Sequence, residues 1–135
     1  MNVELLFDEP YARITYEAAH DMICLELKGV IGGDDYRKTF NTLMDKGLEK
    51  NINKLYVNQA TMDRSTMEAK AWLVTNWLPR VKKAFGDDVK VALILSKNLF
   101  TKIGGEFIVN TVKAISKFDI KTFSSTDDAR EWIIK

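Results

Sequence analysis

Apolar and polar side chains follow the pattern of β-strands in the first part of the chain. Residues 11–17 and 22–30 are rich in β-branched, aromatic and aliphatic side chains, and four residues, Ala18 to Asp21, separate them. A connection of this length suits a hairpin. We therefore predict that the chain opens with an antiparallel pair of strands.

A helix is predicted next. The segment Gly32 to Asp35 combines a turn with two acidic residues, which suit the positive end of the helix dipole. Gly47 is expected to end the helix. In between, apolar side chains recur at helical spacing, at Tyr36, Phe40, Leu43 and Met44.

The middle of the chain predicts a short buried strand over residues 54–58, a polar loop over residues 59–64, and a long helix. Ser65 and Glu68 fit a capping box, in which each side chain satisfies a backbone N–H group at the start of a helix. The helix is therefore predicted to begin at Ser65.

Pro79 lies inside the apolar pattern of this long helix, which Gly86 is expected to end. Proline has no backbone N–H group and clashes with the carbonyl four residues earlier, here that of Thr75. A kink is therefore expected near Trp77.

The last third predicts a central strand over residues 89–95, a helical region from about 98 to 117, a short strand over residues 120–123, and a final helix capped by Ser125. The predicted order is ββαβαβαβα. Alternating strands and helices produce parallel strands with right-handed crossovers. The fold class is therefore α/β, with a mixed, mostly parallel sheet, an antiparallel start and helices on its faces, in a single domain over residues 1–135.

Composition limits the classes of function. The 135 residues are 46% hydrophobic, enough for one core, and 20 basic against 19 acidic side chains give a formal charge of +1. No overall field favours nucleic acid or an anionic membrane. The single cysteine, Cys24, indicates a reducing compartment, and the acidic amino terminus does not resemble a secretory signal. The apolar run Val91–Leu95 is too short to span a bilayer, so a cytoplasmic protein is expected.

No catalytic residue, metal ligand or cofactor site is predicted. His20, the one histidine, falls in the predicted hairpin turn, where a surface role is favoured, and no serine has the setting of a hydrolase nucleophile. The glycine pairs at 32–33 and 104–105 complete no phosphate-binding motif. An enzyme is therefore not expected.

A binding site is expected at the carboxyl ends of the parallel strands, where open sheets bind ligands. Asn58, Asp63 and Arg64 belong to this polar edge. Ser65 follows at the predicted helix start, which can hold phosphate either as an ion or attached to the hydroxyl. The alternative interpretation is that Ser65 only caps the helix.

Trp77 is the other candidate. On an ideal helix it points about 140° away from Trp72, which matches the apolar face. Trp77 is therefore expected to be exposed or to cover a second surface, where it could contact a partner or ligand together with Arg80.

Two stretches carry a resemblance to a known family. They are Leu55-Tyr56-Val57-Asn58, which leads to Thr61-Met62-Asp63-Arg64-Ser65, and Trp77-Leu78-Pro79-Arg80. With the order of elements, they resemble the STAS domain, the anti-sigma-factor-antagonist fold, and more closely the small bacterial proteins grouped as STAS/SEC14-like. In STAS antagonists a strand leads to an Asp-Ser-Ser-Gly-like turn whose serine is phosphorylated. Asp63 and Ser65 match that turn, while Arg64 departs from it.

The resemblance implies a non-enzymatic regulatory or scaffold module that acts through protein–protein contact. Its contact face would be the helix that begins at Ser65 and the loop before it, with Ser65 as a possible phosphorylation site. The SEC14 side of the resemblance implies an alternative, a carrier or sensor of a lipid or small apolar ligand. That ligand would lie between the sheet and the kinked helix around Trp77 and Pro79.

Overall fold

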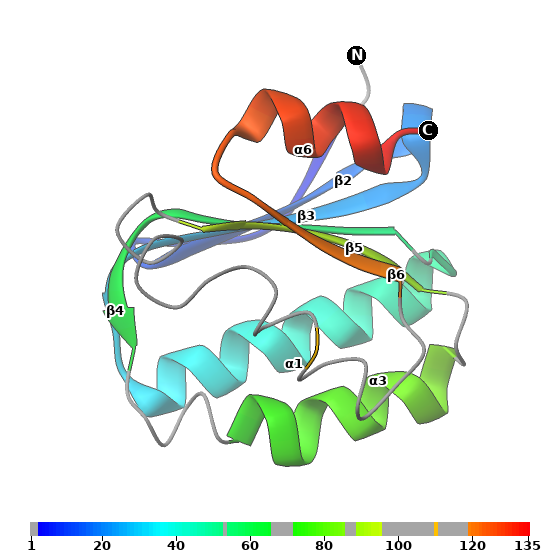
Figure 1. The fold of residues 1–135 in the computed structure, drawn as a ribbon. Helices are drawn as coiled ribbons and strands as arrows, with labels where there is room; N and C mark the ends of the chain where they lie inside the picture. Colours follow the sequence, from blue (N-terminus) through cyan, green and yellow to red (C-terminus); the bar gives the residue numbers. More distant parts are fainter. Residues whose placement is uncertain (1–2, 53, 66–71, 86–88, 96–109, 111–118) are drawn as a thin grey trace.

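A computed structural model describes residues 3–52, 54–65, 72–85, 89–95, 110 and 119–135 (Figure 1). Its centre is a six-stranded sheet in which the strands lie side by side in chain order. The strands are β1 (Val3–Glu9), β2 (Ala12–Glu17), β3 (Met22–Ile31), β4 (Lys54–Ser65), β5 (Lys90–Leu95) and β6 (Asp119–Phe123). The first three strands pair antiparallel, and β3 to β6 pair parallel. The predicted mixed α/β sheet with an antiparallel start is confirmed.

Two strands differ from the prediction. β1 was not predicted, and its carboxylates Glu4, Asp8 and Glu9 interrupt the apolar pattern by which a strand is recognised. β4 continues to Ser65, so the stretch 59–65 is strand, where a loop over 59–64 was expected. Ser65, the predicted start of a helix, is the last residue of β4. The first helical turn predicted after it, residues 66–71, lies outside the described residues, as does most of the helical region predicted over 98–117.

Helices cover both faces of the sheet (Figure 1). One face carries α1 (Gly33–Lys50) and α3 (Leu78–Phe85), and the opposite face carries α6 (Thr126–Ile133). A short 3₁₀ turn, η1 (Ala18–His20), joins β2 to β3. Crossovers of one handedness that add parallel strands in one direction place their helices on the same face. This explains why α1 and α3 lie together.

Gly47 lies inside α1 rather than at its end. The helix continues to Lys50, and Asn51 closes it in the left-handed conformation with φ of 54°. A Cβ atom at Gly47 would lie 3.1 Å from Cζ of Phe85 on α3. Gly47 therefore permits close packing of the two helices, a role that a sequence pattern does not distinguish from a helix stop.

The interruption expected near Trp77 takes the form of a π-helical turn. This turn, η2 (Leu73–Trp77), comes directly before α3, whose second residue is Pro79. Proline cannot donate a backbone hydrogen bond, and both prolines and π turns are places where helices depart from regular α-helical geometry.

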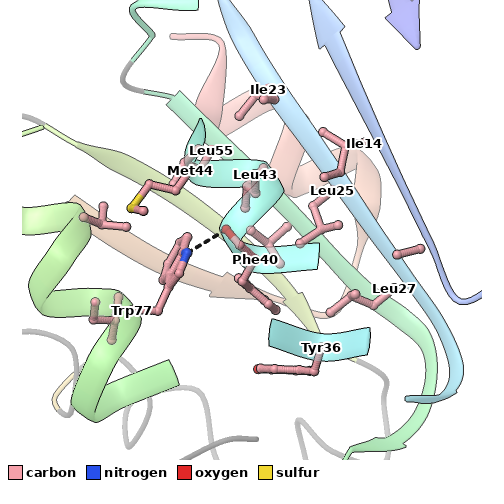
Figure 2. Close-up of a cluster of buried hydrophobic side chains, with 14 of the residues drawn as sticks. Ile14, Ile23, Leu25, Leu27, Tyr36, Phe40, Leu43, Met44, Leu55 and Trp77 are labelled. Carbon is pink, nitrogen blue, oxygen red and sulfur yellow. Dashed lines mark hydrogen bonds between the residues drawn. The ribbon is translucent and has the colours of Figure 1, made fainter. Parts of the chain in front are cut away.

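The main core lies between the sheet and the α1 and α3 helices (Figure 2). Its buried side chains include Ile14, Ile23, Leu25, Leu27, Tyr36, Phe40, Leu43 and Trp77. A second, smaller cluster lies on the other face under α6 and contains Met22, Ala92, Ile94, Ala129 and Ile133. The sheet is thus buried on both faces over its centre.

Candidate functional site

The pairing of β3 with β4 becomes irregular towards the carboxyl ends of the two strands. Pairing is regular up to Glu26 opposite Asn58, and it resumes at the end with Ile31 opposite Ser65. Five steps along β3 therefore match seven steps along β4, which contains two extra residues. Such bulges bend a strand and redirect its side chains.

Asn58 stabilises the first irregularity. Its Oδ1 atom accepts a hydrogen bond from the backbone N–H of Ala60 at 2.9 Å. Asparagine side chains commonly satisfy the backbone two residues onward in this way. Asn58 thus shapes the strand at the predicted edge.

The second irregularity in the β3–β4 pairing changes the direction of the Val30 side chain. The register shifts between Gly29 and Val30, and Gly29 has φ of +61°, a conformation that side chains with Cβ disfavour. Val30 is 60% exposed, although it belongs to a strand of the central sheet. It pairs in register with Arg64. An apolar side chain is therefore presented to solvent next to the predicted polar edge.

The end of β4 lies beside the start of α1. Ser65 pairs with Ile31, and the next residue, Gly32, is the N-cap of α1 (Figure 1). Asp34 and Asp35 occupy the first turn of α1, and Arg37 binds the Asp34 carboxylate at 2.5 Å. The strand ends and the helix start therefore form one edge with charges of both signs.

Trp77 does not belong to this edge. It is only 5% exposed, and its ring packs against Phe40 of α1 with centroids 5.1 Å apart (Figure 2). Its Nε1–H donates to the carbonyl of Phe40 at 2.6 Å. The expectation that Trp77 is exposed or covers a second surface was wrong, because hydrogen bonds in a π turn join residues five apart. Trp77 consequently lies over the same side as Trp72, which packs against the same core.

Arg80 lies on the exposed side of α3. Its Nη1 atom donates to Oδ1 of Asn76 at 2.9 Å, one helical turn earlier. This contact holds the guanidinium along its own helix. No hydrogen bond or ion pair among the described side chains joins Arg80 to Asn58.

A second polar cluster was missed by sequence reasoning. Glu17, at the end of β2, is 5% exposed, and both its oxygens accept hydrogen bonds from Arg130 of α6, one of them at 3.0 Å. His20 Nε2 lies 3.6 Å from the same carboxylate. The partners are 113 residues apart, so no local pattern connects them. The hydrogen bond with Glu17 raises the pKa of Arg130.

Cys24 lies near this cluster, on the same face of the sheet. Burial and, secondarily, the Glu17 charge raise the pKa of its thiol from 9.0 to about 11. The thiol is therefore protonated at neutral pH and is a weak nucleophile. Within the described part of the chain, no group of three or more metal-ligating side chains comes together, and no helix there has the length and apolar character needed to cross a membrane.

Comparison with known proteins identifies the family. A family model described as SpoIIAA-like matches residues 22–134. The chain belongs to the SpoIIAA-like family. The match includes the β3–β4 edge and Arg130, whereas Glu17 and His20 precede it.

The fold agrees with this assignment. A crystal structure of an uncharacterized DUF3478 protein with a SpoIIAA-like fold, from Shewanella loihica, superimposes with a TM-score of 0.62. The alignment covers 94% of this chain and 97% of the other at 18% identity, which supports a shared fold. No curated protein matches the sequence at a significant level.

Proposed function

We propose that this SpoIIAA-like chain is a non-enzymatic regulatory or scaffold module that binds another protein through the carboxyl ends of β3 and β4. The observation that carries the proposal is Val30, which the irregular pairing turns outward at 60% exposure beside Arg64. Protein interfaces commonly combine an apolar contact with arginine. We include Asp63 and Ser65, the neighbours of Arg64 in β4, in the proposed contact face.

Ser65 is the proposed point of regulation. Phosphorylation would add close to two negative charges at the end of β4, where the backbone pairs with Ile31 next to the N-cap of α1. The amino end of a helix favours negative charge, while Asp34 and Asp35 oppose it. A phosphate there would change the charge of the contact face and therefore the affinity for a partner.

Photo-cross-linking in the native host tests the contact face. A photo-reactive amino acid placed at position 30 should capture a discrete protein, and Arg64→Glu in the same chain should abolish the product. Position 48 is the matched control, because Leu48 is 45% exposed on α1. Equal capture at both positions, or none at position 30, would refute the proposed face.

Ser65 variants test the switch separately. Ser65→Asp should alter the yield of the position-30 product, whereas Ser65→Ala should leave it unchanged. If the two variants capture equal amounts, the switch is refuted and the contact face stands. Native mass spectrometry of protein purified from its own host tests the carrier alternative, which a co-purifying small apolar molecule would favour over protein binding.

A further inference from the structure

Helix α6 covers a part of the sheet that is separate from the main core. Of its eight residues, only Ala129 and Ile133 are fully buried, and they pack on Met22, Ala92 and Ile94. The main core lies on the opposite face, under α1 and α3 (Figure 1). Lifting α6 would therefore expose the small cluster and leave the main core intact.

Polar contacts hold α6 at its start, its middle and its end. The Tyr56 hydroxyl donates to the Thr126 carbonyl at 3.3 Å. Lys90 Nζ donates to the Trp132 carbonyl at 2.9 Å and lies 4.5 Å from the centre of its indole ring. Arg130 binds Glu17 with two hydrogen bonds. Contacts of this kind exchange readily with water, unlike a large apolar interface.

The middle contact differs from the other two because it involves a buried carboxylate, that of Glu17. A carboxylate only 5% exposed is costly to bury unless a cation compensates it, and Arg130 supplies that cation from α6. When α6 lifts, Glu17 regains water at the same moment as it loses Arg130. The opened state therefore does not contain an unpaired buried charge.

The surface under α6 continues a surface that is already open. In register, Leu5, Thr15, Cys24, Tyr56 and Ala92 form one row across five strands on this face. Leu5 is 57% exposed at the uncovered end of the row, whereas Cys24, Tyr56 and Ala92 lie in the cluster under α6. Displacement of α6 would join the two parts into one larger face.

We propose that α6 is a displaceable cover, which opens while the rest of the chain stays folded, and that the Glu17–Arg130 pair sets how often it opens. This device is independent of the proposed contact at Val30. Opening exposes Met22, Ala92 and Ile94, which α6 otherwise covers.

Native-state hydrogen exchange of the full chain tests the proposal. In the wild type, amides of residues 126–133 should exchange at least about tenfold faster than those of β3 and β5, with little dependence on added denaturant, as expected for local opening. If α6 exchanges only with global unfolding, at the same rate and with the same denaturant dependence as β3, the proposal is wrong.

Arg130→Met tests the role of the ion pair. This variant should speed exchange in α6 by about tenfold or more and leave β3 unchanged. Arg13→Met is the matched control, because Arg13 forms an exposed pair with Asp8 at 3.4 Å and should leave α6 unaffected. Unchanged α6 exchange in Arg130→Met would overturn the assigned role. If Arg130→Met does not fold, the Glu17→Gln, Arg130→Met double variant removes both charges and should still show faster exchange in α6.

Discussion

At the scale of single residues, the surroundings of Cys24 and Trp77 differ from what their neighbours in the sequence indicate. Cys24 lies in an apolar run, which predicts its burial but not the nearby Glu17. Trp77 was expected on a second helix face, and only the π turn explains its place in the core. The surroundings of Cys24 depend on a tertiary contact, and the burial of Trp77 depends on a local departure from α-helical geometry.

The raised thiol pKa predicts a loss of stability in alkaline solution. The folded chain holds the Cys24 proton up to about pH 11, whereas the unfolded thiol loses it near pH 9.0. Unfolding then releases a proton, so this contribution to stability is complete below pH 9 and disappears as the pH rises towards 11. Between pH 8 and 10 the wild type should lose about 1 kcal/mol more of its free energy of unfolding than Cys24→Ala. Parallel pH profiles of the two proteins, measured by urea denaturation, would refute the prediction.

The hydrogen bond of the Trp77 indole predicts a second effect on stability. Trp77→Phe keeps an aromatic ring against Phe40 but removes the donor to its carbonyl. The free energy of unfolding should fall by about 1–3 kcal/mol, because a buried hydrogen bond and part of the packed ring area are lost. Trp72→Phe, at a partly buried position against the same core, is the control and should cost less. An equal loss in both variants would show that ring size, not the hydrogen bond, matters.

At the scale of elements, the strand pair β3–β4 best shows what a pattern of residues can predict. The regular part, residues 54–58, is short and apolar and was predicted correctly. The irregular part, residues 59–65, contains Asp63 and Ser65, residue types typical of loops and helix starts, and a loop over 59–64 with a helix start at Ser65 was predicted there. The two extra residues of β4 let this polar stretch pair as a strand. The pairing depends on β3, a partner that the local propensity of the stretch does not take into account.

Gly29 makes this irregular pairing possible. Gly29 has φ of +61°, and no atom lies within 4 Å of a Cβ built on it. A side chain at this position would therefore lower stability through backbone strain and not through a steric clash. Gly29→Val should lower the free energy of unfolding by about 1–2 kcal/mol or more and change amide signals around Val30 and Arg64. Gly29→Asn should cost less, because asparagine tolerates the left-handed region. Equal losses in the two variants would point away from backbone strain.

At the scale of the whole molecule, the class of fold was predictable because alternating strands and helices allow few arrangements. The antiparallel start, the parallel centre and the SpoIIAA-like family agree with the prediction. The candidate edge was predictable only in outline. Asn58 lies at the first bulge and Asp63, Arg64 and Ser65 near the end of β4, but Trp77 lies in the core and Arg80 binds its own helix.

The main core predicts where much of the stability of the chain resides. Leu25, in the central strand β3, is 1% exposed within the main core. Leu25→Ala should lower the free energy of unfolding by about 3 kcal/mol and lower the thermal midpoint of the entire chain. Val3→Ala, at a 50% exposed position on the edge strand β1, should cost about 0.5 kcal/mol or less. Calorimetry of both variants measures the difference, and similar midpoints would contradict this distribution of stability.

The order of the strands in the sheet, the same as their order in the chain, has a consequence for biosynthesis. As the ribosome extends the polypeptide, each new strand finds its neighbour already made, since β4 adds to β3, β5 to β4 and β6 to β5. Among the described strands, none has to be inserted between two that formed earlier. The sheet can therefore grow from one edge during translation, and α6, which follows β6 in the chain, is the last described element to be made.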